Sequence, residues 1–428
     1  MLNRTLAPPS ITPALPVLLR PATEMLPNGI ELSCFQDDSQ SIVELELIFP
    51  AGSHDAKSRQ KEGYFFRMLG EGSKNKTAKQ LADAISFLGA EMEFSHHPDY
   101  DTIHISCLSR FFLPMLTLLE EVWANPVFPE KEWKTLQETQ LRQHEVNLQK
   151  TSFLVARLFK EKLYSSDLDY GYSTDPGFVG SLESSVFPAM YENLKSTGPA
   201  LALLAGNAGK DAINELRNWL LHFNKCREVN REKPSALPEL IPGTYLEEKP
   251  GSNQASLRMG HYTIGSRHSD SAILSLTLEI FGGYFGSRLM SNIREDKGWT
   301  YGIYAQRAPH QGMPHLVVSC DVNADASLAV VDEIRKEAEI LQQQLVDEEE
   351  LLKVKNYILG QFLSSLTHVF GIAERYKSVW IHGTSFSRVE ENQRIIREAD
   401  AISVRDAAIR YLNFNQSIIC ISGPKTGA

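Results

Sequence analysis

The sequence predicts an α+β protein built from two similar halves. An ordered series of helix-like and strand-like segments occurs twice at a nearly constant offset, and a charged, proline-containing segment separates the two copies. The chain has 428 residues, 42% of them hydrophobic, which is enough for more than one hydrophobic core. We expect each half to be a mainly antiparallel sheet with helices packed on one side.

In the first half, a helix is followed by two strands and a pair of long helices. Thr77 and Gln80 have the spacing of a capping box at the start of the first helix, and Gly89 follows its last periodic residue. The later elements are expected as strands at 91–94 and 102–108, and as helices that begin at Phe112 and Pro129.

The second half repeats this order. Its elements are expected as a helix at 287–295 that Gly298 ends, strands at 300–304 and 315–320, and a helix at 326–345. Asp347 and Glu350 have the spacing of a capping pair for a further helix. The acidic run 348–350 is typical of a solvated helix start, where the helix dipole favours negative charge.

The repeat and the prolines predict four segments. Prolines in the first and third of them oppose stable helices and favour extended chain. The segments are an N-terminal arm at 1–24, a first domain at 25–227, a linker at 228–244 and a second domain at 245–428.

Composition excludes several classes of function. The net charge of −10, from 43 basic and 53 acidic residues, argues against broad binding of nucleic acid. No apolar run reaches the ~18 residues of a membrane-spanning helix. Prolines interrupt the N-terminal stretch where a secretory signal would be apolar, so a cytoplasmic location is expected, with an unrecognised export route left open. The five cysteines are isolated and are expected to be reduced, mostly buried thiols.

Arg294 and Tyr301 are the leading functional candidates. They lie seven residues apart, after a turn that contains Gly282, Gly283 and Gly286. A guanidinium and a phenol can both donate hydrogen bonds to a carbonyl oxygen that gains negative charge during a reaction. The alternative is a surface arginine at a helix end and a tyrosine packed in the core. The glycines either line a flexible substrate-admitting loop or, the favoured reading, form a helix end and a tight turn.

Histidines offer a weak case for a metal site. His96 and His97 are adjacent on a probable strand and point to opposite faces, so they cannot bind one ion together. A cross-strand pair of His97 and His104 stays open, but surface polar residues are the favoured interpretation. His54 has no partner at helical spacing and is expected in a loop. No metal site is expected in this chain.

The sequence resembles the M16 peptidases, the pitrilysin- or insulinase-like family with the LuxS/MPP-like metallohydrolase fold. The resemblance covers nearly the whole chain and implies two similar α+β domains joined by a linker. Its landmarks, in order, are the LPNG segment at 26–29, AGS at 51–53, the loop at 72–77, NP at 125–126 with FP at 128–129, and the segment 282–305.

Active members of that family carry a His-x-x-Glu-His zinc motif and a further glutamate ligand on a later helix. The corresponding segment of this chain, 62–72, contains no histidine. Gln143 is the best match for the later glutamate, with Glu138 and Glu145 as close alternatives. The resemblance therefore implies that this chain binds no zinc and that zinc belongs to a partner.

Arg294 and Tyr301 match the pair with which active family members bind the scissile carbonyl. The resemblance implies the non-zinc subunit of a heterodimeric zinc metalloendopeptidase, closed around an unfolded peptide with a partner that carries the zinc motif; a homodimer is the other assembly considered. Two further functions stay open. One is a structural subunit like the core proteins of the respiratory bc1 complex, and the other is a peptide-binding protein or chaperone without hydrolysis.

Overall fold

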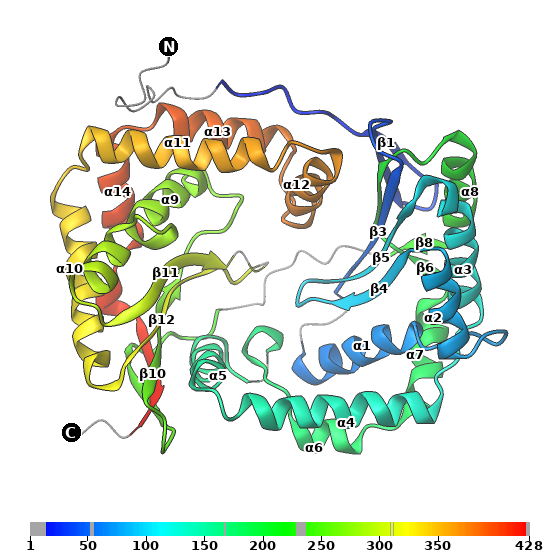
Figure 1. The fold of residues 1–428 in the computed structure, drawn as a ribbon, viewed down its shortest axis with the longest axis horizontal. Coiled ribbons are helices and arrows are strands. Elements are labelled where there is room, and N and C mark those ends of the chain that lie inside the picture. Colours follow the sequence, from blue (N-terminus) through cyan, green and yellow to red (C-terminus); the bar gives the residue numbers. More distant parts are fainter. Residues whose placement is uncertain are drawn as a thin grey trace, which may run out of the picture.

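The fold contains two β-sheets on opposite sides of the molecule, with helices on the outer face of each (Figure 1). The structure is a computed structural model. His54 and most of the expected linker lie outside the residues that it describes, and residues 22–24 of the expected arm belong to the strand Ala22–Met25. The described residues are 14–51, 55–166, 168–227, 237–308, 310 and 312–424.

The two sheets share the order of five strands, and β1 is an additional strand of the first sheet. The first has the strand order β1-β2-β7-β3-β5-β4 and the second has the order β11-β12-β10-β13-β9. Neighbours pair antiparallel except β2 with β7 and, at the equivalent place, β9 with β13. This confirms the prediction of two similar α+β halves with mainly antiparallel sheets.

The strands of the first sheet are β1 (Ala22–Met25), β2 (Glu31–Gln36), β3 (Ile42–Pro50), β4 (Glu91–His96), β5 (Tyr100–Leu108) and β7 (Leu201–Gly206). Those of the second sheet are β9 (Gly243–Glu248), β10 (Gln254–Tyr262), β11 (Thr300–Ala308), β12 (His315–Asn323) and β13 (Ile418–Gly423). A small separate pair consists of β6 (Thr197–Gly198) and β8 (Lys225–Cys226).

The helices fall into two groups along the chain. Those that precede residue 227 are α1 (Ala56–Leu69), α2 (Ala78–Phe87), α3 (Phe112–Ala124), α4 (Glu130–Asn147), α5 (Thr151–Tyr164), α6 (Pro176–Ser181), α7 (Phe187–Leu194) and α8 (Lys210–Leu220). The later ones are α9 (Ser271–Leu278), α10 (Ser327–Gln343), α11 (Glu348–Ser364), α12 (Val369–Ile381), α13 (Ser387–Glu398) and α14 (Ala401–Tyr411).

Each half lends one helix to the other half's sheet. Helix α12 packs on β7 of the first sheet, and α5 packs on β10 and β13 of the second sheet. The expectation of helices on only one side of each sheet is therefore incomplete. Strands β7 and β13 are buried at every position, because these apolar central strands have a helix on both faces.

Several local predictions hold in the structure, and one is wrong. Thr77 and Gln80 form the expected capping box of α2, and Gly89 and Gly298 both adopt positive φ, which glycine tolerates best. Asp347 caps α11, but Glu350 is not its capping partner. Its carboxylate instead accepts two hydrogen bonds from the Arg288 guanidinium, at 2.9 and 2.8 Å.

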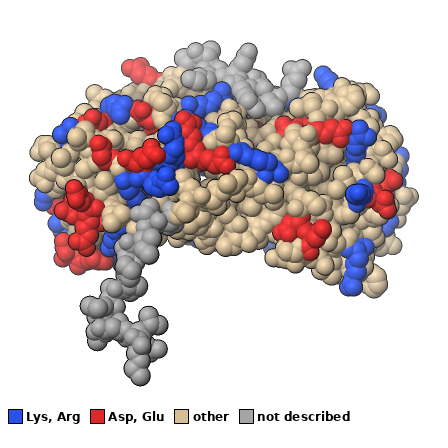
Figure 2. Space-filling model, turned by 90° about the horizontal axis from the view of Figure 1, so that it is seen from above, with Lys and Arg blue, Asp and Glu red and all other residues tan. Residues whose placement is uncertain are grey.

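Charged side chains of both signs lie on the surface. Figure 2 shows acidic and basic side chains interspersed on the face seen from above, without a continuous basic area. Among the helices within the described ranges, none is long and apolar enough to span a bilayer. The five cysteines form no disulfide, and Cys107, Cys320 and Cys420 are buried.

A buried aromatic and histidine cluster joins the two halves. The Tyr164 hydroxyl, at the end of α5, hydrogen-bonds the backbone carbonyl of Met313 at 2.8 Å and also contacts Nδ1 of His315. Tyr170 stacks on His310 with ring centroids 4.6 Å apart. Burial, reinforced by neighbouring positive groups, lowers the pKa of His310 to about 4 and that of His315 to about 3.

These histidines predict acid sensitivity of the folded state. As pH falls below about 6.5, the unfolded chain takes up protons that the buried rings cannot, so the free energy of unfolding decreases between about pH 6.5 and 4, by up to about 1.4 kcal/mol per pH unit for each ring. Urea unfolding across this range measures the slope. His315→Gln should flatten the curve, whereas His222→Gln, at an exposed position, should not. Parallel curves for the two variants would contradict this account.

Candidate functional site

Two π-helical segments position the candidate residue Arg294. They are Glu279–Gly283 and Met290–Asp296, on either side of a short turn. The wider helical turn is visible in the bond from the Lys297 N–H to the carbonyl of Asn292, five residues back, at 3.2 Å. Such segments are rare and occur frequently at functional sites.

The glycines before Arg294 allow close packing at this turn. A Cβ on Gly282 would lie 2.8 Å from the Cβ of Ala305, so glycine lets the helix approach β11. Gly283 lies against the Glu279 carboxylate, and Gly286 is exposed in the turn beside the Tyr284 ring. The three glycines lie at a helix end and in a turn, and their role in substrate binding stays a prediction.

The Arg294 side chain is held by an aromatic ring. Its guanidinium carbon lies 4.4 Å from the centroid of Phe285, a cation–π contact, and Phe285 is 60% exposed. Within the described part of the chain, the Arg294 guanidinium has neither a hydrogen bond nor an ion pair. Its N–H donors are therefore available to another molecule.

Tyr301 lies at the start of the edge strand β11, where a β-bulge interrupts the pairing with β12. The register shifts between Thr300 and Ile303, and the Thr300 hydroxyl supports the bulge by donating to a carbonyl of β12 at 2.7 Å. Bulges at sheet edges often redirect a side chain. Tyr301 is 88% exposed, so it does not pack in the core, and the described structure gives its hydroxyl no hydrogen-bond partner.

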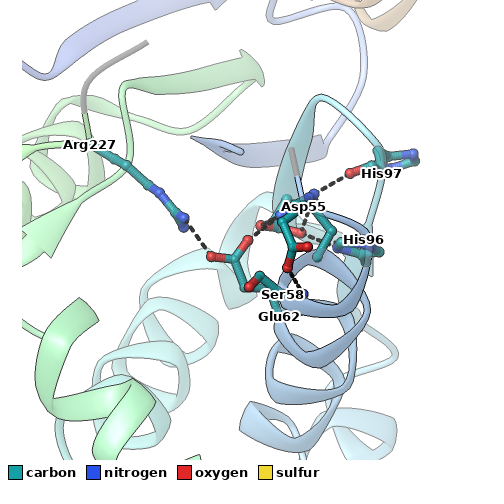
Figure 3. Close-up of polar contacts among 8 residues, drawn as sticks. Asp55, Ser58, Glu62, His96, His97 and Arg227 are labelled. Carbon is teal, nitrogen blue, oxygen red and sulfur yellow. Dashed lines mark hydrogen bonds and ion pairs between the residues drawn. The ribbon is translucent and has the colours of Figure 1, made fainter. Parts of the chain in front are cut away.

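A buried arginine lies in the first half, three residues before the segment 62–72. Arg59, on α1, is fully buried, as is Asp101 on β5. Its Nη1 donates to Asp101 at 3.0 Å and also contacts Glu62, and its Nη2 donates to the backbone carbonyl of His97. Figure 3 shows this cluster at the start of α1, with Arg227 reaching Glu62 from another element at 3.1 Å.

His96 completes the Arg59 cluster. Its Nδ1 lies 2.5 Å from Asp101, and its ring packs against Gly63 of α1, where an added Cβ would lie 2.7 Å from the ring. Burial acts to raise the pKa of Asp101, but the hydrogen bond of His96 and the charge of Arg59 outweigh it and hold that pKa below its usual value. The cluster is thus a buried ion network.

The histidine predictions need correction. His96 is not a surface polar residue, since it belongs to this network. His97 stacks on Tyr100 at 4.6 Å between ring centroids. His104 pairs across the sheet with Glu93 and not with His97, so the cross-strand histidine pair is wrong.

The residues of this region do not fit a zinc ion. A guanidinium carries no lone pair for a metal, and the positions of α1 that line the neighbouring cavity are Gln60, Gly63, Tyr64 and Arg67. Across the described ranges, no group of three or more His, Cys, Asp or Glu side chains is placed to hold a metal. We therefore derive no metal chemistry from this chain.

Helix α4 carries the three positions considered for the later glutamate. Glu138 pairs with Arg142 on the exposed face, and Gln143 and Glu145 are exposed as well. The α4 residue that lines the cavity of about 360 Å³ beside α1 is Gln140. None of the three expected positions faces this cavity.

Arg59 was not predicted from the sequence. A charged residue four positions before Gly63, on a helix with the apolar run 64–66, was the available signal. That signal does not distinguish a buried arginine from a solvated one. Its partners Asp101 and His96 come from a hairpin about forty residues later, and only the fold brings them together.

Removing the buried arginine should strongly destabilise the protein. Arg59→Met leaves Asp101 buried without a full counter-charge, which should lower the free energy of unfolding by about 3–5 kcal/mol. Arg142→Met breaks an exposed ion pair and should cost at most about 1 kcal/mol. Adding Asp101→Asn to Arg59→Met should restore part of the loss. Equal costs for the two single variants in urea unfolding would refute a buried ion network.

Comparisons with known proteins point to M16 peptidases and to proteins named as zinc proteases. A family model described as "Peptidase M16 inactive domain" matches residues 194–358. An uncharacterized zinc protease of Rickettsia felis is 22% identical over 402 residues, covering 90% of this chain and 93% of that protein. The uncharacterized zinc protease YmxG of Bacillus subtilis is 20% identical over 343 residues, covering 79% of this chain and 83% of that protein.

Solved structures share the fold over the whole chain. An M16 inactive-domain protein of Pseudomonas fluorescens superposes with a TM-score of 0.83 at 23% identity, covering 96% of this chain and 99% of that one. The periplasmic protease PqqL of Escherichia coli gives 0.76 at 14% identity, covering 97% of this chain and 47% of that one. The chain is thus similar to M16 peptidases in fold over nearly its whole length, and its residues 194–358 match the model of that family's inactive domain.

Proposed function

We propose that this chain is the non-zinc subunit of a heterodimeric M16 metalloendopeptidase and supplies Arg294 and Tyr301 to the scissile carbonyl. The observation that carries the proposal is the state of these two side chains. Both are at the surface of the second half, on a π-helical segment and a β-bulge respectively, and neither has an internal hydrogen bond within the described structure. The N–H groups of Arg294 and the hydroxyl of Tyr301 are therefore available to a ligand.

The chemistry of the pair suits amide cleavage. When a nucleophile attacks a peptide carbonyl, negative charge collects on the oxygen. A guanidinium and a phenol in place beforehand stabilise that charge by charge-assisted and neutral hydrogen bonds. Arg294 is oriented by Phe285 and Tyr301 by the bulge, so little reorganisation is needed at the moment of reaction. The metal ion and the attacking water would come from the partner's motif.

The edge strands support binding of an extended, unfolded peptide. β4 and β11 are the outermost strands on the corresponding edges of the two sheets, and Figure 1 shows their hairpins directed toward each other across the middle of the molecule. An extended peptide can add its backbone to such an edge. Tyr301 and Tyr304, both exposed on β11, would contact the side chains of that peptide.

Arg59 supports the assignment of the metal to a partner. Where this chain would need metal ligands, it has a buried ion network that stabilises the fold. A second chain with the His-x-x-Glu-His motif would then be required for hydrolysis. Purification from the native host, with mass spectrometry of the proteins that accompany this chain, would identify that partner.

Arg294→Ala should impair catalysis without impairing assembly. Loss of one donor to the developing oxyanion typically lowers kcat by about 10²–10³-fold, and Tyr301→Phe should act in the same direction. The measurement is kcat for peptide hydrolysis by the complex reconstituted with the partner, together with the Kd of the two chains. Tyr357→Phe, which removes an exposed phenol on α11, away from the proposed peptide-binding strand, is the matched control.

Three outcomes would change the assignment. An unchanged kcat for Arg294→Ala in a fully assembled, active complex would exclude the catalytic role. Peptide binding without hydrolysis, with the partner present and loaded with metal, would favour a peptide-binding protein. Failure to bind peptide at all would favour a structural subunit.

Zinc should be absent from the chain purified alone. In the described part of the chain no group of three or more His, Cys, Asp or Glu side chains could hold a metal, so elemental analysis should give far less than one zinc per chain. The reconstituted complex should contain about one zinc per pair, and a chelator should abolish its activity without separating the chains. One zinc per isolated chain would contradict the placement of the metal in the partner.

A further inference from the structure

A second cavity, remote in the sequence from Arg59, is lined by arginines. It has a volume of about 320 Å³ and lies between α9, α12, α13 and the end of β11. Arg307, Arg375 and Arg388 line it together with His382 and several serine and threonine hydroxyls, and its described lining includes no aspartate or glutamate. A positively charged cavity without carboxylates has the composition of an anion site.

Two of the arginines have no acidic partner in the described structure. Arg307 reaches only the Ser275 hydroxyl, at 3.4 Å, and its Nη1 is buried without a hydrogen bond. Arg375 donates to the Ser365 hydroxyl at 2.8 Å and packs on a phenylalanine ring. Burial lowers the pKa of both guanidinium groups, with no carboxylate to offset it. Arg388 differs, since it pairs with Glu391 at 2.9 Å.

Side-chain amides add further unused polar groups to the same walls. The side-chain oxygens of Asn392 and Gln393, on α13, are buried and have no hydrogen-bond partner. Both residues line the cavity, as Arg307 does. Buried polar groups are nearly always paired in folded proteins. Three unpaired groups around one cavity therefore indicate a polar ligand there.

We propose that this cavity binds the phosphate group of a small phosphorylated molecule. Two guanidinium groups without counter-charges provide about two positive charges, and a phosphate monoester carries about −1.5 to −2 at neutral pH. Its oxygens can accept from Arg307, from Arg375 and from the hydroxyls between them. The volume exceeds that of a phosphate group alone, so the amides of Asn392 and Gln393 would contact the organic part.

A carboxylate is the competing ligand chemistry. A single carboxylate brings one negative charge and two acceptor oxygens, which would leave one guanidinium uncompensated. A dianionic, tetrahedral group satisfies both. The site is separate from the proposed role of Arg294 and Tyr301, and its occupation does not depend on hydrolysis.

The first test is phosphate binding to the full chain. Equilibrium dialysis with inorganic phosphate should give one saturable site per chain, and phosphate should raise Tm by a few degrees over chloride at equal ionic strength. Acetate should give a weaker rise at the same concentration. The absence of a saturable site, or a stronger response to acetate than to phosphate, would overturn the proposal.

Arginine variants separate a ligand site from a structural one. Arg307→Met and Arg375→Met remove buried charges that have no counter-charge, so in chloride they should be at least as stable as the wild type. In phosphate each should lose the rise in Tm and weaken binding at least tenfold. Arg394→Met, at an exposed position on α13 that pairs with Glu398, should keep both responses. Wild-type phosphate affinity in the Arg307 and Arg375 variants would contradict the proposal.

Discussion

The exchange of helices between the two halves is the constraint on which the rest of the structure depends. Strands β7 and β13 are apolar on both faces, and neither half covers both faces of its own sheet. Helix α12 supplies the missing layer for the first sheet and α5 supplies it for the second. Exposing either face would leave a row of leucine or isoleucine side chains in water, at a cost of about 25 cal/mol per Å². The two halves are thereby fixed relative to each other, with their edge strands on the inner side.

Local signals in the sequence predicted most of the fold. The Thr77–Gln80 capping box, the glycines at 89 and 298, and the alternating strands around Cys107 and Cys320 depend only on nearby residues, and all appear in the structure. The duplication was visible because the same order of such signals occurs twice. The exchange of α5 and α12 was not visible in the sequence, because it depends on which distant surface an amphipathic helix covers.

The candidate site, too, could be predicted from the sequence only in part. Arg294 and Tyr301 could be found from their spacing and from a family resemblance, but the cation–π contact, the π-helical turns and the bulge that expose them are tertiary features. The sequence also showed that histidines were missing from 62–72. It did not show that Arg59 forms an ion pair with Asp101, since Asp101 and His96 come from another hairpin. In physical terms, the Arg59 guanidinium neutralises Asp101 in this chain, and this part of α1 stabilises the fold.

A double-variant cycle on the reconstituted complex tests the central claim, that Arg294 and Tyr301 act together on one substrate oxygen, most directly. Single-turnover hydrolysis of a peptide would be measured for Arg294→Ala, Tyr301→Phe and the combined variant, with peptide affinity measured in parallel. If both donors hold the same oxyanion, the combined loss in rate should be clearly smaller than the product of the single losses, with peptide affinity little changed. Single variants that hydrolyse peptide at the wild-type rate would contradict the account.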